Sequence, residues 1–191
     1  MSILSKNAIL SNIFRTRSGE MAAAEGLDAA AIEAAVNAGA MVILANPAHT
    51  GVTPTVIGQP AKVKVNANIG TSMLVTDVAM EMEKVALCKS AGAHTLMDLS
   101  TAGDLAAIRS AILAATDLPL GTVPLYGVAQ RHIARGGDPS DFTVAEILAE
   151  IAHQAEAGVD FMTLHCGITR RGVELASQGG RVTGIVSRGG S

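Results

Sequence analysis

The feature of this sequence that most constrains its fold is a succession of short apolar runs, each of which ends in a polar side chain. Helical patterns separate the runs, so the chain alternates strand, loop and helix. The runs and the polar residues that follow them are Lys62–Asn66 with Asn68, Thr95–Met97 with Asp98 and Ser100, Leu120–Thr122 with Tyr126, Phe161–Leu164 with His165, and Val182–Val186 with Ser187. Parallel sheets and barrels carry their ligand sites at the carboxyl ends of the strands. We therefore expect these side chains to converge on one pocket.

The spacing of apolar residues and helix caps predicts the individual elements. Thr143 and Glu146 form a capping box ahead of one helix, and Asp104 begins another. The runs are too apolar to have one face in water, as is typical of buried parallel strands. We expect strands at 41–44, 62–66, 95–98, 120–122, 161–165 and 182–186, and helices at 28–38, 77–90, 104–115, 127–134, 143–157 and 170–178. A doubly wound sheet and a (β/α)8 barrel both fit this order.

The count of strands favours a partial barrel. A complete barrel takes about 250 residues, whereas roughly 130 residues with about five strands follow the first 58 positions here. We predict an α/β fold in which residues 1–58 form an N-terminal preamble and residues 59–191 form the first part of a (β/α)8 TIM-type barrel. Within the preamble, residues 1–17 are basic and amphipathic. We expect a helix packed on the domain there, with an organelle-targeting segment as the alternative.

Composition excludes several classes of function. The net charge is −3 with only 2% aromatic residues, so neither a basic field nor stacking platforms for nucleic acid are expected. No apolar run approaches the roughly 18 residues that span a bilayer, so no membrane partner is expected. Cys88 and Cys166 are the two cysteines of the chain, which suits a reducing compartment, and we expect a cytoplasmic protein.

Amides, a hydroxyl group and an imidazole are the candidate ligand groups at the strand ends. The side chains of Asn66 and Asn68 suit hydrogen bonding to a heterocycle or a ribose, or they satisfy a tight turn. Tyr126 presents the only phenol, unless it is a core aromatic. His165 is the best placed histidine for bonding a ligand or moving a proton. The remaining histidines are interpreted as loop or surface residues: His49, His94, His132 and His153.

Asp98 and the last residues of the chain are candidates for charged contacts. Asp98 could bind a ligand, cap the next helix or pair with Arg188. Ser187, Arg188 and Gly189 combine a hydroxyl group, a guanidinium group and backbone amides, which suits an anion such as phosphate, although a glycine-rich tail is the alternative. No ligand spacing typical of zinc or iron–sulfur sites and no G-x-S-x-G nucleophile elbow is present, so no metal ligand or catalytic residue is assigned.

Taken together, the motifs resemble those of the phosphomethylpyrimidine synthase family of thiamine biosynthesis, from about residue 20 onward. The segments that carry the resemblance are Ala45-Asn46-Pro47, Asn66-Ala67-Asn68-Ile69-Gly70, Met97-Asp98-Leu99-Ser100, Gly121-Thr122-Val123-Pro124-Leu125-Tyr126, Leu164-His165-Cys166-Gly167 and the stretch from Arg181 to Ser191. Members of that family are (β/α)8-barrel radical S-adenosylmethionine lyases. They convert 5-aminoimidazole ribotide into 4-amino-5-hydroxymethyl-2-methylpyrimidine phosphate with a [4Fe–4S] cluster and a zinc or similar divalent metal ion.

The resemblance also implies a set of substrate-binding residues. These are Asn68, Met97, Tyr126 and His165, with Ser187, Arg188 and Gly189 near the phosphate. Met97 enters only through the resemblance, because a core methionine is the default interpretation.

The sequence departs from the family pattern in its second half. Family members continue with Asp-Gly-x-Arg and Glu-Gly-Pro-Gly-His segments, two metal-binding histidines and a C-x2-C-x4-C motif, none of which is present here. We therefore expect the N-terminal part of such a synthase, with a homodimer or a second chain that completes the barrel as its assembly, and a degenerate relative as the alternative. The alternatives are a 5-hydroxybenzimidazole synthase, which uses the same ribotide, and a noncatalytic ribotide-binding half-barrel.

Overall fold

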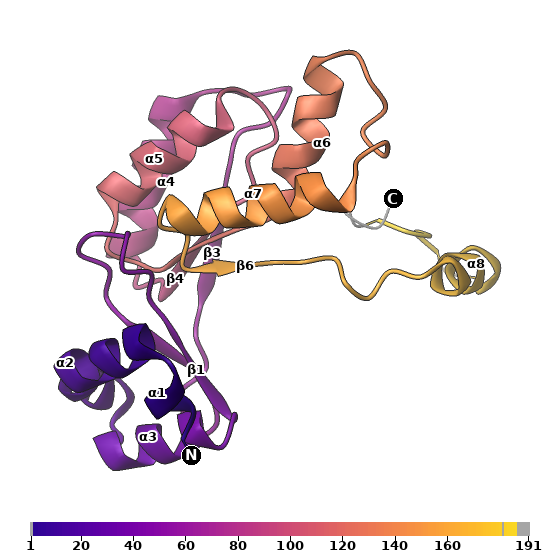
Figure 1. The fold of residues 1–191 in the computed structure, drawn as a ribbon. Helices are drawn as coiled ribbons and strands as arrows, with labels where there is room; N and C mark the ends of the chain where they lie inside the picture. The colour runs from indigo at the N-terminus through magenta and orange to yellow at the C-terminus, as the bar shows by residue number, and fades with distance from the viewer. Residues whose placement is uncertain (1, 181, 187–191) are drawn as a thin grey trace.

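The N-terminal part of the protein is a helical unit closed by a β-hairpin (Figure 1). A computed structural model describes residues 2–180 and 182–186. Helices α1 (Ile3–Lys6), α2 (Ala8–Glu25) and α3 (Ala29–Asn37) pack against β1 (Met41–Leu44), which pairs antiparallel with β2 (Thr55–Gly58). Their apolar side chains form a core of their own: Leu4, Met21, Ile32, Val36, Met41 and Val56. The expected N-terminal helix packed on the domain is thereby confirmed.

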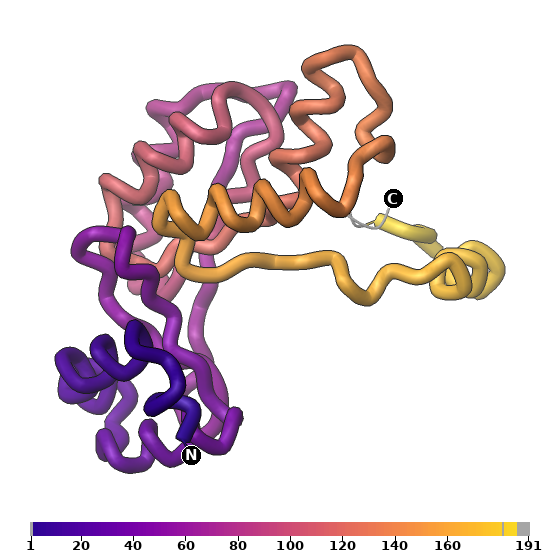
Figure 2. The backbone as a smooth tube through the Cα atoms, viewed as in Figure 1, coloured from indigo at the N-terminus to yellow at the C-terminus, as the bar shows by residue number. Residues whose placement is uncertain are grey.

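A parallel sheet forms the second part, and its strands lie in the order of the sequence. In the described residues it consists of β3 (Asn66–Ile69), β4 (Thr95–Asp98), β5 (Leu120–Thr122) and β6 (Phe161–Met162). Helices α4 (Val78–Ser90), α5 (Leu105–Ala115), α6 (Pro124–Ala134) and α7 (Val144–Glu156) connect these strands, as the backbone path in Figure 2 shows. The expected α/β architecture with parallel strands is therefore confirmed.

Alternation along the strands separates a covered face of the sheet from an inner face. Ile69, Leu96 and Leu120 pack with residues of α4 and α5 in one core cluster. Asn68, Met97 and Gly121 are paired with one another across the three strands and therefore belong to the opposite, inner face. The register of the sheet thus decides which strand-end side chains can meet a ligand.

Two expected strands are wrong, and tertiary contacts give the reason for the first. Residues 62–65 are not a strand, because Glu25 of α2 holds them: its carboxylate accepts from the Lys62 backbone N–H and pairs with the Lys64 ammonium group at 2.7 Å. Strand β3 begins only at Asn66, where pairing with Thr95 becomes possible. The intervening Val63 is 93% exposed, so its apolar side chain does not mark a buried strand.

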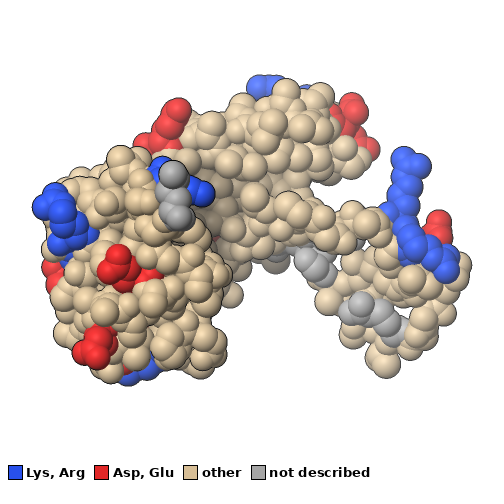
Figure 3. Space-filling model, turned by 60° about the horizontal axis from the view of Figure 1, so that its bottom comes forward, with Lys and Arg blue, Asp and Glu red and all other residues tan. Residues whose placement is uncertain are grey.

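The second wrong strand is 182–186, which lies beyond an extended arm. After β6 the chain leaves the body and reaches α8 (Arg170–Gln178), in which no residue is buried. Figure 3 shows this lobe, with its cluster of basic side chains, standing away from the rest of the surface. Residues 182–186 follow α8 as turn and bend, and Val182 is fully exposed. A strand needs a partner, and among the described residues no strand pairs with this segment. The expected strand 161–165 is likewise shortened to Phe161–Met162.

A buried histidine links the N-terminal unit to the parallel sheet through hydrogen bonds. His49 lies in the β1–β2 connection, and its Nδ1 is 2.7 Å from Asp160 Oδ2 just before β6. The other ring nitrogen, Nε2, lies 2.9 Å from the Thr116 carbonyl oxygen after α5. Only 1% of the His49 side chain is exposed. His49 thus lies in a loop, as expected, but it is buried because this loop is folded into the base of the sheet.

Candidate functional site

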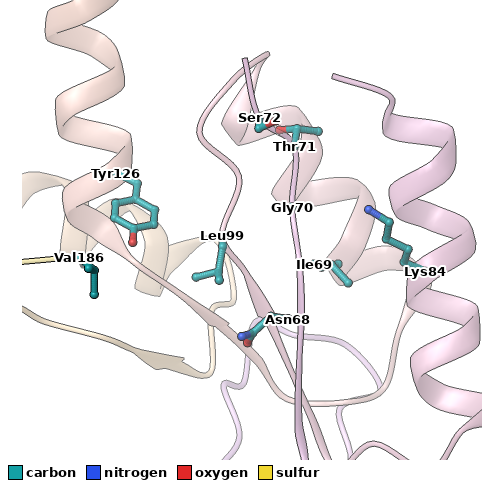
Figure 4. A pocket seen from close by; sticks show the side chains of 9 residues that line it. All are labelled: Asn68, Ile69, Gly70, Thr71, Ser72, Lys84, Leu99, Tyr126 and Val186. Atoms are coloured by element: carbon teal, nitrogen blue, oxygen red, sulfur yellow. The ribbon is translucent and has the colours of Figure 1, made fainter. Parts of the chain in front are cut away.

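A cavity of about 510 Å³ opens where the parallel strands end. It is lined by residues from β3 and the loop after it, the loop after β4, α4, α6 and the segment after α8: Asn68, Ile69, Gly70, Thr71, Ser72, Lys84, Leu99, Tyr126 and Val186. Figure 4 shows the Tyr126 phenol on the same side of β3 as Leu99 and Asn68, whereas Lys84 lies on the other side. Two of the expected site residues, Asn68 and Tyr126, therefore share one cavity.

The loops after β3 and β4 approach each other closely at the rim of this cavity. Gly70 has a φ of 142°, and a Cβ atom there would lie 2.5 Å from the Ser100 backbone nitrogen. The Thr71 backbone N–H donates to Ser100 Oγ, and the Thr101 N–H donates to the Thr71 carbonyl oxygen. Glu81 of α4, which is 1% exposed, accepts from the Gly70 N–H at 2.7 Å. The rim is thus a rigid turn that only glycine permits.

Asn68 lies on the inner face with its amide engaged by a neighbour. Asn66 Nδ2 donates to Asn68 Oδ1 at 2.9 Å, and the Thr95 hydroxyl group donates to Asn66 Oδ1 at 2.8 Å. Asn68 is exposed and belongs to β3 itself, so it lies within the strand instead of beyond it. Met97 lies beside Asn68 in the register and is 9% exposed. Its Sδ is 3.9 Å from Thr163 Oγ1.

Tyr126 and His165 are brought together from positions far apart in the sequence. Their ring centroids are 6.4 Å apart with an interplanar angle of 35°. Tyr126 is in the first turn of α6, which begins at Pro124 and not at 127 as expected. The His165 Nδ1 atom is buried and has no hydrogen-bond partner among the described residues. A buried polar atom without a partner costs free energy, which favours a bound ligand beside this ring.

Asp98 does not line this cavity, and of its three possible roles the structure excludes only the capping of α5, while pairing with Arg188 lies outside the described residues. It is paired with Ile69 and Thr122, which belong to the face covered by helices. Its carboxylate accepts from the Ser100 N–H at 2.9 Å, and α5 is capped by Asp104 instead. Burial raises the pKa of the Asp98 carboxyl group, while the hydrogen bonds from Ser100 act in the opposite direction.

A buried network of hydrogen bonds and ion pairs joins α6, the helix that carries Tyr126, to α7 and β5. Glu150 of α7 pairs with the guanidinium group of Arg131 and lies 3.6 Å from that of Arg109. Gln154 donates to Glu150 and accepts from the Thr122 hydroxyl group. These contacts fix α6 and α7 on the strand β5, and thereby fix the first turn of α6 over the cavity.

The other histidines have structural surroundings. His94 and His153 are exposed, and His132 pairs with Glu146 at 2.9 Å on the surface of α6 and α7. His94 Nδ1 accepts from the Val65 N–H, which closes the turn before β4.

The two cysteines do not fit a [4Fe–4S] cluster. Cys88 is half-buried on α4 and packs against the core between helices and sheet, whereas Cys166 is exposed in the arm. Three thiolates on one side of a site are needed to hold such a cluster. Within residues 2–180 and 182–186, no three His, Cys, Asp or Glu side chains gather in a way that could hold a metal ion. In the same ranges no helix is both long and apolar enough to cross a bilayer.

The three residues expected near the phosphate lie outside the described residues: Ser187, Arg188 and Gly189. Sequence reasoning missed Thr71, Ser72, Leu99 and Lys84 as lining residues. Thr71 and Ser72 follow the strand residue Ile69 directly, so the strand-end rule that selected Asn68 would have found them with the correct strand bounds. Lys84 has no such signal, because it comes from a helix that packs beside the strand.

The fold and the site define an α/β protein with a small-molecule cavity at the carboxyl ends of parallel strands. The model of the Radical SAM ThiC family matches residues 7–191, and the chain belongs to this family.

Several curated relatives carry the name phosphomethylpyrimidine synthase. A phosphomethylpyrimidine synthase of Syntrophus aciditrophicus is 45% identical over 167 residues, which is 87% of this chain and 39% of the relative. Proteins of the same name from Desulfotalea psychrophila and Pyrococcus furiosus are 42% and 41% identical over 172 residues, or 90% of this chain and 40% of each relative. The chain therefore spans about two fifths of the length of the relatives it matches.

Proposed function

We propose that this chain is the ribotide-binding N-terminal part of a phosphomethylpyrimidine synthase. The observation that carries the proposal is the match of the family model over residues 7–191, in a chain whose Asn68 and Tyr126 line one cavity with His165 beside the Tyr126 ring. The reaction is the conversion of 5-aminoimidazole ribotide into 4-amino-5-hydroxymethyl-2-methylpyrimidine phosphate by radical S-adenosylmethionine chemistry. The proposed setting is the cytoplasm.

The proposed fold of the whole protein is a (β/α)8 barrel, of which residues 59–191 supply the first part. The order β3-β4-β5-β6 supports a barrel over a doubly wound sheet, because barrel strands follow the sequence without a switch in direction. The inner face then becomes the barrel interior. Further residues of a longer protein, or a partner chain in a homodimer or hetero-oligomer, would complete it and cover the edges of β3 and β6.

The residues of this chain would bind and orient the ribotide. Asn68 offers amide groups from the inner face, Met97 gives an apolar surface, and Tyr126 and His165 close the opposite side. Ser187, Arg188 and Gly189 are proposed for the phosphate. The cluster, and a zinc or similar metal ion, would bind to residues that this chain does not contain, because its cysteines do not fit such a group.

Binding of 5-aminoimidazole ribotide to the 191-residue chain tests the site, with isothermal titration calorimetry as the measurement. We expect His165→Gln to weaken binding at least about fivefold, since one lost hydrogen bond costs about 1 kcal/mol or more. The matched control is His153→Gln, which changes an exposed histidine of α7. Equal affinity of the His165 variant and the control would contradict the site, and a wild-type chain that binds no ribotide would contradict the proposed function.

Two further measurements separate the proposal from its alternatives. An immunoblot of the source cells with an antibody against this segment gives the native mass. A band well above 19.4 kDa supports a piece of a longer synthase, whereas a band at that mass favours a noncatalytic half-barrel or a two-chain enzyme. Product analysis of the active enzyme distinguishes the pyrimidine phosphate from 5-hydroxybenzimidazole.

A further inference from the structure

Three polar side chains form a chain of hydrogen bonds across the inner face, beginning at a buried hydroxyl group. Thr95 is 3% exposed and stands directly opposite Asn66 in the register of β3 and β4. Its hydroxyl group donates to Asn66 Oδ1 at 2.8 Å. Cross-strand pairs of this kind hold side chains in one orientation.

The second bond of this chain runs along β3. Asn66 and Asn68 are two residues apart, so their side chains lie on the same face of the strand. Asn66 Nδ2 donates to Asn68 Oδ1 at 2.9 Å. The carbonyl oxygen of Asn68 therefore faces Asn66, so its Nδ2 atom is the group on the other side, available to a ligand in the cavity that Asn68 lines.

The direction of this chain follows from the burial of Thr95. An amide can turn by 180° and exchange its oxygen and nitrogen with little change of shape. If Asn66 turned, its Nδ2 would face the Thr95 hydroxyl group, which would then lose Asn66 Oδ1, the acceptor that it has in the described residues. An unpaired buried donor costs about 1–3 kcal/mol. The observed direction is therefore favoured, and it reaches Asn68 through Asn66.

We propose that Asn66 and Thr95 are positioning residues that make Asn68 a hydrogen-bond donor to the ribotide. The inference rests on the proposed function and adds a rule of specificity to it. The ligand atom that meets Asn68 must be an acceptor, such as an unprotonated ring nitrogen or a ribose oxygen. Asn66 itself acts through Asn68 and needs no contact with the ligand.

Three substitutions test the chain of bonds through ribotide affinity. Thr95→Val leaves the Asn66 amide two orientations of similar energy, so about half of the molecules present the wrong group and binding weakens about twofold. Asn66→Ala should have a similar effect. Asn66→Asp still accepts from Thr95 but turns the Asn68 amide round, because the carboxylate attracts its Nδ2, and binding should weaken at least about tenfold.

Controls separate this effect from added charge and from loss of structure. Thr55→Val makes the same change on β2, away from the cavity, and should bind ribotide like the wild type. The affinity of 5-aminoimidazole riboside, which lacks the phosphate, should fall equally for Asn66→Asp, whereas charge repulsion would spare it. Asn68→Ala measures the contact itself.

Amide proton exchange, followed by NMR in the chain without ligand, tests the orientation independently. In the wild type the Asn66 side-chain amide should exchange more slowly than that of Asn68, and in Asn66→Asp the Asn68 amide should become the protected one. Two results would overturn the inference and leave the proposed function intact. The first is ribotide binding that is weak for Asn68→Ala but unchanged for Asn66→Asp. The second is an Asn68 amide that exchanges as fast in Asn66→Asp as in the wild type. A wild-type chain that binds no ribotide would instead overturn the proposed function, and with it the ligand part of the inference.

Discussion

Replacement of Asp160 by alanine should destabilise the protein more than replacement of any exposed acid. The Asp160 carboxylate accepts from the backbone N–H groups of Asn46 and Leu120 and from the His49 ring, each at 2.7 Å. Its side chain is 0% exposed. One buried carboxylate thus joins the β1–β2 connection, the start of β5 and the residue before β6.

The magnitude follows from what the substitution leaves behind. Asp160→Ala removes the acceptor from an imidazole group of which only 1% is exposed and from two backbone donors. A buried donor that loses its acceptor costs about 1–3 kcal/mol, so the three donors together should cost about 3–5 kcal/mol. For a chain of this size about 1 kcal/mol corresponds to roughly 2–4 °C, so the midpoint of thermal unfolding should fall by about 6–20 °C. Asp160→Asn should also destabilise, because its Nδ2 group would face one of the donors.

Urea unfolding, followed by circular dichroism at pH 7, measures the effect. Asp141→Ala is the matched control, because Asp141 is exposed and its side chain makes no hydrogen bond in the described residues. Its free energy of unfolding should stay within about 0.5 kcal/mol of the wild type. A double-mutant cycle with His49→Ala should give a coupling energy above about 1 kcal/mol. A loss below about 1 kcal/mol for Asp160→Ala would refute the reasoning that this carboxylate carries the junction.

Three other predictions concern packing and charge. Gly127→Ala should lower the free energy of unfolding in urea by about 1–3 kcal/mol, because its Cβ would lie 2.8 Å from Glu150 Oε1. The control Gly19→Ala, whose Cβ meets nothing within 4 Å in α2, should raise it by up to about 1 kcal/mol. Equal effects would contradict the packing of α6 on α7. Hydrogen bonds from the backbone and side chain of Thr143 lower the pKa of Glu146 from 4.5 to about 2. The capping box therefore stabilises α7 above pH 4.5, and this stabilisation is lost as the pH falls to about 2. An NMR titration of the Glu146 carboxyl carbon measures this pKa, and a midpoint near 4.5 would count against the prediction. Burial raises the pKa of Asp98, so the folded protein binds this proton more tightly than the unfolded chain, and ionisation of Asp98 at neutral pH opposes folding. Asp98→Asn should therefore unfold at a urea concentration equal to or above that of the wild type at pH 7. A clear decrease in this concentration would show that the Asp98 charge stabilises the fold.

Local signals in the sequence predicted the helices well. The capping box of Thr143 and Glu146 is present in α7, and Asp104 caps α5 as expected. The strands at 95–98 and 120–122 also have the expected bounds, because they are short apolar runs between two packed helices. Each of these features depends on residues within a few positions of one another.

Strand bounds failed where distant residues competed for the backbone. The segment 62–65 has alternating apolar residues, but Glu25, 37 residues before Lys62, holds it beside α2. The segment 182–186 is equally apolar and pairs with no strand in the part of the chain that the structure describes. Neither contact can be read from a local pattern.

The candidate site divides in the same way. The rule that polar residues at strand ends gather in one place selected Asn68, Tyr126 and His165, and the structure brings Tyr126 to Asn68 in one cavity and to His165 in a ring contact. The same rule selected Asp98, which faces the helices because side chains alternate along β4. The ligand roles of the selected residues, including Ser187, Arg188 and Gly189, stay predictions.

The sequence by itself determined the alternation of helix and strand, the caps and the family, because periodicity, capping and motifs are recorded in neighbouring residues. Only the tertiary structure decided the register of β3 against β4, the face on which each polar side chain lies and the junction between His49 and Asp160, which are 111 residues apart. The physical reason is that a buried hydrogen bond or a strand pair is stable only when both partners have been brought out of water together, and that depends on how the whole chain packs.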